Sequence, residues 1–123
     1  MVSKHPFRTL LAATALSALA WPVTARAEAR SFEVTASKYQ FEPAVLTVDQ
    51  GDHVTITLKS SDRSHGFAIK EFGVKTDIPA GGGTVSVEFV ADKPGTFVFS
   101  CSKYCGSGHG RMKGQLVVKA KGQ

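Results

Sequence analysis

Residues 54–59 read Val54-Thr55-Ile56-Thr57-Leu58-Lys59, and apolar residues alternate with polar ones through the whole stretch. Successive side chains of a β-strand point to opposite faces, so this alternation predicts a strand with one buried face. Comparable stretches, separated by turn-forming residues, lie at 32–34, 41–48, 67–69, 72–79, 85–89, 97–99 and 116–118. No stretch after residue 28 has a convincing helical period. We therefore expect an all-β sandwich of seven to eight strands.

The N-terminal 27 residues of the 123-residue chain differ from this pattern. They contain Lys4 and Arg8, then an apolar run over 10–19, then a small-residue cleavage site that ends at Ala27. These are the parts of a secretory signal peptide, and the run is shorter than the ~20 residues that cross a membrane. We expect cleavage near Ala27, a mature domain over 28–123, and a periplasmic or secreted location.

Composition and charge exclude several classes of function. The chain is 42% hydrophobic and 20% charged, which is ordinary for a globular protein. Removal of the leader takes away three of the 15 basic residues and none of the 10 acidic ones, so the net charge falls from +5 to +2. This leaves no dense basic stripe for nucleic acid, and no later segment is long and apolar enough to span a membrane.

The segment CSKYCGSGHGRM at 101–112 contains the residues that indicate chemistry. It holds four possible metal ligands: Cys101, Cys105, His109 and Met112. Thiolate and thioether ligands together favour copper, whereas zinc sites rarely use Met. A metal held by this loop also needs a ligand from elsewhere in the fold, and His65, just before a predicted strand, is the best candidate.

Each of these residues also has an ordinary interpretation. Two Cys in an exported protein can form a disulfide, so a Cys101–Cys105 bond is the ordinary interpretation of this pair, and copper binding would require the reduced form. Met112 alone would be a core residue, and His65 and His109 alone would be unremarkable histidines. His53 is out of register with the apolar positions of its strand, so we expect it at the surface.

Taken together, these residues resemble a family. The segment 101–112 is similar to the dinuclear copper A (CuA) motif in the cupredoxin domains of cytochrome c oxidase subunit II and nitrous oxide reductase. Segments 65–69, 72–79 and 89–95 also resemble these proteins, and the similarity covers roughly 31–119. The resemblance implies a cupredoxin-like Greek-key β-sandwich with two copper ions. It also implies six ligands: bridging Cys101 and Cys105, terminal His65 and His109, the Met112 thioether and the Lys103 carbonyl.

The chain departs from this family at three points. Lys103 stands where the family typically has Glu, whose side chain in the oxidases helps to hold a second metal at a subunit interface. A cleavable leader stands where oxidase subunit II usually has transmembrane helices. The oxidases also have an aromatic patch that includes Trp for electron entry, whereas the mature chain has no Trp and could replace it only in part, through Tyr104 and its Phe residues.

The resemblance implies an exported copper protein that transfers one electron at a time and is not itself an enzyme. The expected partners are redox proteins such as a c-type cytochrome or a terminal reductase or oxidase, and we expect a monomer. Two alternatives stay open. The first is a periplasmic copper-handling protein, such as a chaperone, sensor or resistance protein. The second is a detached CuA subunit of a terminal oxidase or a nitrous oxide reductase-like enzyme.

Overall fold

The computed structural model describes residues 12–21 and 27–122. Residues 12–21 are exposed and have no regular secondary structure. The basic start of the predicted leader and most of its cleavage site lie outside the described residues, so the leader remains a prediction. None of the helices in the described residues is long and apolar enough to cross a membrane.

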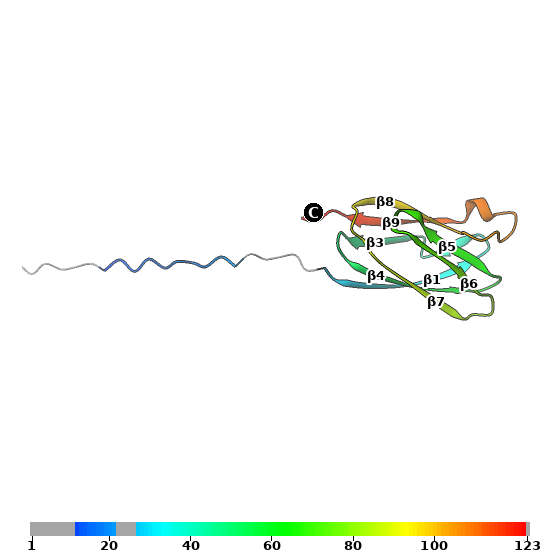
Figure 1. Ribbon diagram of the computed structural model, residues 1–123, viewed down its shortest axis with the longest axis horizontal. Coiled ribbons are helices and arrows are strands. Elements are labelled where there is room, and N and C mark those ends of the chain that lie inside the picture. Colours follow the sequence, from blue (N-terminus) through cyan, green and yellow to red (C-terminus); the bar gives the residue numbers. More distant parts are fainter. Residues whose placement is uncertain (1–11, 22–26, 123) are drawn as a thin grey trace, which may run out of the picture.

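Residues 28–122 form two β-sheets that pack face to face (Figure 1). The first sheet has four strands, in the order β2 (Gln40–Glu42), β1 (Ala29–Ser37), β4 (His53–Ser60) and β7 (Thr84–Val90). The second has five, in the order β3 (Val45–Asp49), β9 (Lys113–Lys119), β8 (Gly95–Ser100), β5 (His65–Ile69) and β6 (Val74–Ile78). The chain passes repeatedly from one sheet to the other, which confirms the predicted cupredoxin-like sandwich.

Alternation of apolar and polar residues builds the core between the sheets. Val54, Ile56 and Leu58 of β4 are buried, as predicted, while His53 at the start of the strand is exposed. Three rings meet at the centre: Phe67 and Phe99 have centroids 5.2 Å apart, and Phe41 packs edge-on against both. Full burial of each such ring contributes roughly 1.5–3 kcal/mol.

Two details differ from the sequence-based expectation. The described residues contain nine strands rather than seven to eight, because the three-residue β2 is a separate strand that pairs with β1. The stretch 72–79 is not extended throughout. A 3-10 turn, η1 (Lys70–Phe72), ends at Gly73, whose φ of 66° favours glycine, and β6 begins only at Val74.

One end of the sandwich gathers the loops that matter for the site. The long β8–β9 loop, which includes the 3-10 turn η2 (His109–Arg111), lies at the end opposite the C-terminus (Figure 1). The β4–β5 loop and the β1–β2 turn lie at the same end, since Ser60 of β4 pairs with Ala36 of β1. Loops from both sheets can therefore contribute to one site.

Candidate metal centre

The β8–β9 loop is closed at its base by backbone hydrogen bonds. The amide of Cys101 donates to the carbonyl of Met112 at 3.1 Å, and the amide of Met112 donates to the carbonyl of His109 at 3.2 Å. The first and last candidate ligands of the loop are thereby brought side by side. Glycine-rich sequence between them lets the chain turn back in so short a segment.

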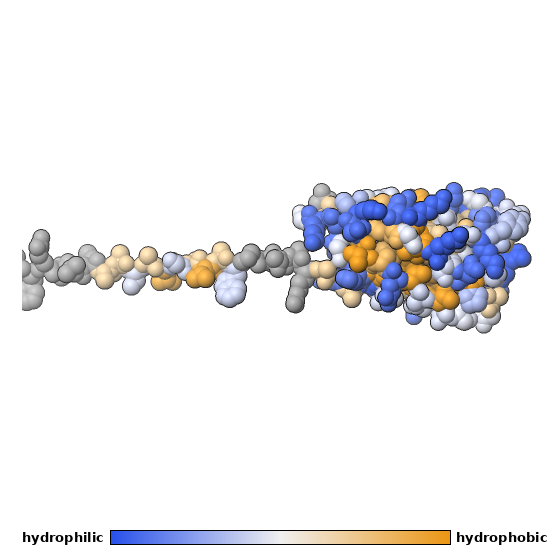
Figure 2. All heavy atoms as spheres, viewed as in Figure 1, coloured by the Kyte–Doolittle hydropathy of each residue, from blue (hydrophilic) through white to orange (hydrophobic). Residues whose placement is uncertain are grey.

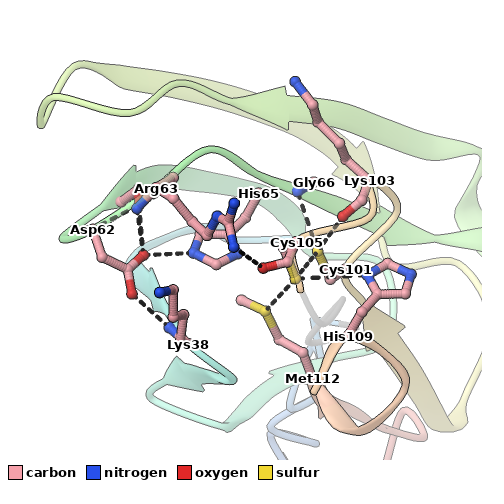
Figure 3. Close-up of polar contacts among 11 residues, drawn as sticks. Lys38, Asp62, Arg63, His65, Gly66, Cys101, Lys103, Cys105, His109 and Met112 are labelled. Carbon is pink, nitrogen blue, oxygen red and sulfur yellow. Dashed lines mark hydrogen bonds and ion pairs between the residues drawn. The ribbon is translucent and has the colours of Figure 1, made fainter. Parts of the chain in front are cut away.

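The side chains of the loop converge on the two cysteine sulfurs (Figure 3). The Sγ atoms of Cys101 and Cys105 are 3.3 Å apart. Cys105 Sγ also lies 3.6 Å from His109 Nδ1 and 3.7 Å from Met112 Sδ. Metal–sulfur bonds are about 2.3 Å long, so a single ion can touch both thiolates at this separation.

The two cysteines are free and buried. Their sulfur separation is well beyond the disulfide bond length of about 2.05 Å. Burial, together with the neighbouring Cys101, raises the pKa of the Cys105 thiol to about 11. A cation placed against the sulfurs would favour the thiolate, so metal binding here releases protons.

His65, the first residue of β5, completes this cluster from another part of the chain. The ligand atoms of His65, Cys101 and Cys105 all lie within 4.8 Å of one another, and all three residues are buried. His65 Nδ1 is a buried nitrogen that has no hydrogen-bond partner among the described residues. Since buried polar atoms are nearly always paired, this nitrogen is well suited to bind a metal ion.

Asp62 fixes the orientation of the His65 ring. Its Oδ1 lies 2.7 Å from His65 Nε2, which therefore donates its proton outward and leaves Nδ1 as an acceptor toward the sulfurs. Partial burial works to raise the pKa of Asp62. The hydrogen bonds from His65 and from the amides of Lys38 and Arg63 outweigh it, so this pKa lies well below its ordinary value.

Arg63 and Tyr39 support the loop from outside. The guanidinium of Arg63 donates to the carbonyl of Cys105 at 2.9 Å, so the segment that supplies His65 also holds the segment that supplies Cys105. The Tyr39 ring packs so closely on Gly108 that a Cβ there would overlap it. The two contacts connect loops that are distant in sequence.

Gly66 allows β5 to approach the cysteine loop. Its amide faces Cys101 Sγ at 3.4 Å. A Cβ at this position would collide with Ser102 Oγ and lie 2.6 Å from the Lys103 amide. Only glycine leaves room for this contact.

Lys103 and Tyr104 form the outer side of the loop. The carbonyl of Lys103 lies 3.0 Å from Cys101 Sγ, whereas its side chain points away from the sulfurs (Figure 3). The Tyr104 side chain is 76% exposed, and its ring centroid is 5.6 Å from that of His109. The carbonyl of residue 103 is thus available to a metal whatever its side chain is.

The structure brings together the six residues expected at the site: His65, Cys101, Lys103, Cys105, His109 and Met112. His53 lies apart from them, exposed at the start of β4. Sequence analysis missed Asp62, Arg63, Gly66 and Tyr39. The carboxylate three residues before His65 was the one available signal, because ligating histidines commonly donate to such a group.

The donor set fits copper. The two cysteine sulfurs and the thioether are soft ligands, which copper prefers, and the two imidazoles beside them also suit copper. The Met112 side chain is fully buried and ends at Cys105 Sγ, so it is available as a ligand as well as a core residue. The buried Nδ1 of His65 has no hydrogen-bond partner within the described part of the chain, and a bound metal ion would provide the missing interaction.

Comparisons with known proteins agree with this geometry. The sequence matches the cupredoxin-like domain family over residues 9–118. It is 42% identical over 78 residues to nitrous-oxide reductase of Stutzerimonas stutzeri, covering 60% of this chain and 12% of the reductase. It is 30% identical over 86 residues to cytochrome c oxidase subunit 2 of Thermus thermophilus, covering 70% of this chain and 63% of the subunit. The chain thus spans only part of both relatives.

A solved structure shows the same fold. The periplasmic domain of cytochrome oxidase subunit II from Bradyrhizobium japonicum superposes with a TM-score of 0.65 at 21% identity, over 74% of this chain and 84% of that domain. The chain therefore belongs to the cupredoxin-like domain family, with homology to cytochrome c oxidase subunit 2 and nitrous-oxide reductase, and its buried His65–Cys101–Cys105 cluster fits a CuA-like site.

Proposed function

We propose that this chain is an exported electron carrier with a dinuclear CuA centre, in the periplasm or outside the cell. The observation that best supports the proposal is the convergence of two free cysteine sulfurs, 3.3 Å apart, with the unpaired His65 Nδ1. Cys101 and Cys105 would bridge two copper ions, with His65, His109, Met112 and the Lys103 carbonyl as the other ligands. Residues 1–27 would be removed on export, and the mature domain would act as a monomer.

When bound, two copper ions that share both thiolates supply a one-electron redox couple in which the electron is spread over both metals. The protein's own part is to keep the ligands in place in both redox states. Asp62 holds the His65 ring, Arg63 holds the Cys105 carbonyl, and the β8–β9 backbone bonds hold Cys101 against Met112. A fixed ligand set keeps structural change small, which favours fast transfer. We propose electron transfer alone, with no catalysis of bond changes.

Copper content under redox cycling tests this function. The reduced domain, loaded with copper and passed over a desalting column, should retain two copper ions per chain through repeated oxidation and reduction. Cys101→Ser and Cys105→Ser should each lose the dinuclear site, because either sulfur would be shared by both metals. Met112→Leu should keep two copper ions and change only the potential, since a thioether is a weak ligand.

The same experiment separates the alternatives. A copper-handling protein would bind a single Cu(I) ion and lose it to a chelator of moderate affinity. Its copper-loaded form would not be stable to oxidation. A detached subunit of a larger oxidase or reductase would retain both ions but would also copurify with a large partner. Because the chain is homologous to parts of longer proteins, the detached subunit is the main alternative to an independent electron carrier.

A further inference from the structure

The surface around the metal centre is positively charged. Three loops border it, at 38–39, 61–64 and 101–112, and they carry four exposed cations: Lys38, Arg63, Lys103 and Arg111. The one carboxylate in these three loops is that of Asp62, which is hydrogen-bonded to His65. The fourth loop at this end, 79–83, has no charged residue. Two further carboxylates lie on the neighbouring strands: Glu42 at the end of β2, and Asp77 opposite Gly66, one residue before the end of β6. Figure 2 shows mostly hydrophilic residues over this end of the sandwich.

At the opposite end, the cations Arg30 and Lys119 are paired with carboxylates. Arg30 contacts three carboxylates, those of Glu28, Asp49 and Asp52, at 3.1–3.2 Å. Lys119 lies 3.5 Å from Asp49. The small positive charge of residues 28–122 is therefore not spread evenly: the three loops at the metal centre carry four cations and one carboxylate, whereas carboxylates and cations are similar in number at the opposite end.

Tyr104 gives this surface a direct connection to the sulfurs. The ring is exposed and lies beside His109, and His109 Nδ1 is 3.6 Å from Cys105 Sγ. Two side chains thus lead from solvent to a bridging sulfur. Lys103 is the next residue in the chain, and its ammonium points away from the sulfurs, so it can meet a partner (Figure 3). Exposed Tyr beside cations is a typical centre of a protein interface.

We propose that Lys38, Arg63, Lys103 and Arg111, named here the cationic collar, dock a redox protein with a carboxylate-rich surface, and that Tyr104 lies at the centre of contact. The proposal rests on the electron-transfer function. Docking brings the partner's redox centre over Tyr104 and His109. One electron then passes between that centre and the bound copper, so that one is oxidised and the other reduced, without transfer of a proton or atom. Complementary charge mainly raises the rate of association, and salt reduces this effect because it screens the charges.

Oxidation of the reduced, copper-loaded protein by small complexes of opposite charge tests the collar. Ferricyanide, an anion, takes one electron and becomes ferrocyanide; tris(phenanthroline)cobalt(III), a cation, takes one electron and becomes cobalt(II). Rates are measured by stopped flow at low and high ionic strength. The variants are Lys103→Glu and Arg111→Glu. Lys121→Glu is the matched control, because it makes the same charge change at the far end of the sandwich.

The collar predicts that ferricyanide reacts faster at low salt than at high salt. Lys103→Glu and Arg111→Glu should each slow it by about tenfold at low salt and hardly at all at high salt, with the opposite trend for the cobalt complex. Lys121→Glu should change little. Equal effects of Lys103→Glu and Lys121→Glu would overturn the collar. So would oxidation of the unmodified protein by the cobalt complex that is faster at low salt than at high salt. Failure to react with either oxidant, or to hold two copper ions, would instead overturn the electron-transfer function.

Discussion

At the scale of single residues, the site depends on which nitrogen of His65 carries the proton. Asp62 accepts from Nε2 at 2.7 Å, and Nδ1 has no partner. The ring cannot reverse this arrangement without losing the carboxylate. Asp62 is thus a positioning residue, because it acts on the metal site through His65 and does not touch the sulfurs.

Removal of this carboxylate should weaken metal binding without dismantling the fold. We expect Asp62→Ala to lower copper affinity by about 10–100-fold, the range typical of lost partners of ligating histidines. Asp62→Asn should lose less, because its amide oxygen can still accept from Nε2. Competition against a copper chelator measures the affinity. The matched control is Asp77→Ala, an exposed carboxylate on β6, and an equal loss in that variant would contradict the role of Asp62.

At the scale of elements, two close contacts determine how the strands meet. At the metal end, β5 approaches the cysteine loop through Gly66. At the other end, Asp52 ties the starts of β1 and β4 together. Its buried carboxylate accepts from the amides of Asp49 and Glu28 and from the guanidinium of Arg30.

The Gly66 contact predicts a glycine requirement that is local to β5. In Gly66→Ala, the new methyl group should displace Ser102 and the Lys103 backbone, so the variant should fold but lose most of its bound copper. Gly110→Ala, in the same loop as the ligands, should retain copper because a Cβ there meets nothing within 4 Å. Copper content and circular dichroism of both variants provide the measurement. Full copper binding by Gly66→Ala would show that the site does not need the close contact between β5 and the cysteine loop.

Asp52 predicts a dependence of stability on pH. Burial works to raise its pKa, but hydrogen bonds from the Asp49 and Glu28 amides and from Arg30 outweigh it, so the pKa lies below the ordinary 3.8. A depressed pKa contributes stability above the unfolded value, and this stability is lost as the pH falls through the folded value. Asp52→Asn should therefore be about 1–3 kcal/mol less stable at pH 7. The difference from the unmodified protein should shrink below pH 3.8, and denaturant titrations at the two pH values test it.

The same carboxylate would link folding to the proposed removal of residues 1–27. The amide nitrogen of Glu28 lies 3.2 Å from Asp52 Oδ1. Cleavage after Ala27 would turn this nitrogen into a charged α-amino group beside a buried carboxylate. Because charged hydrogen bonds are stronger, the chain beginning at Glu28 should be about 1 kcal/mol more stable than one that retains Ala27. Denaturation of both chains, with and without Asp52→Asn, tests this. An equal difference in the Asp52→Asn background would exclude the ion pair.

At the scale of the whole molecule, the sequence predicted the features that depend on local pattern. Alternation identified the strands, and the spacing of Cys101, Cys105, His109 and Met112 identified the loop. The three-residue β2 and the 3-10 turns are too short to show a period, so the number of strands was one or two too low. Arg63 and Tyr39 act through contacts 42 and 68 residues away in the chain, which no local pattern reveals.

The sandwich brings the candidate ligands together at one end of the molecule. β5 places His65, and the β8–β9 loop places the other five candidates, so the arrangement exists only in the folded domain. Metal binding and folding should therefore stabilise each other. The central claim is that this end holds two copper ions that share Cys101 and Cys105.

Electron paramagnetic resonance of the oxidised, copper-loaded domain tests that claim most directly. One unpaired electron shared equally by two copper nuclei gives a seven-line hyperfine pattern, and this is the expected result for the unmodified protein at two copper ions per chain. Cys101→Ser should lose the pattern, which provides the control. A four-line pattern in the unmodified protein, with one copper ion per chain, would contradict the dinuclear centre and indicate a mononuclear cupredoxin instead.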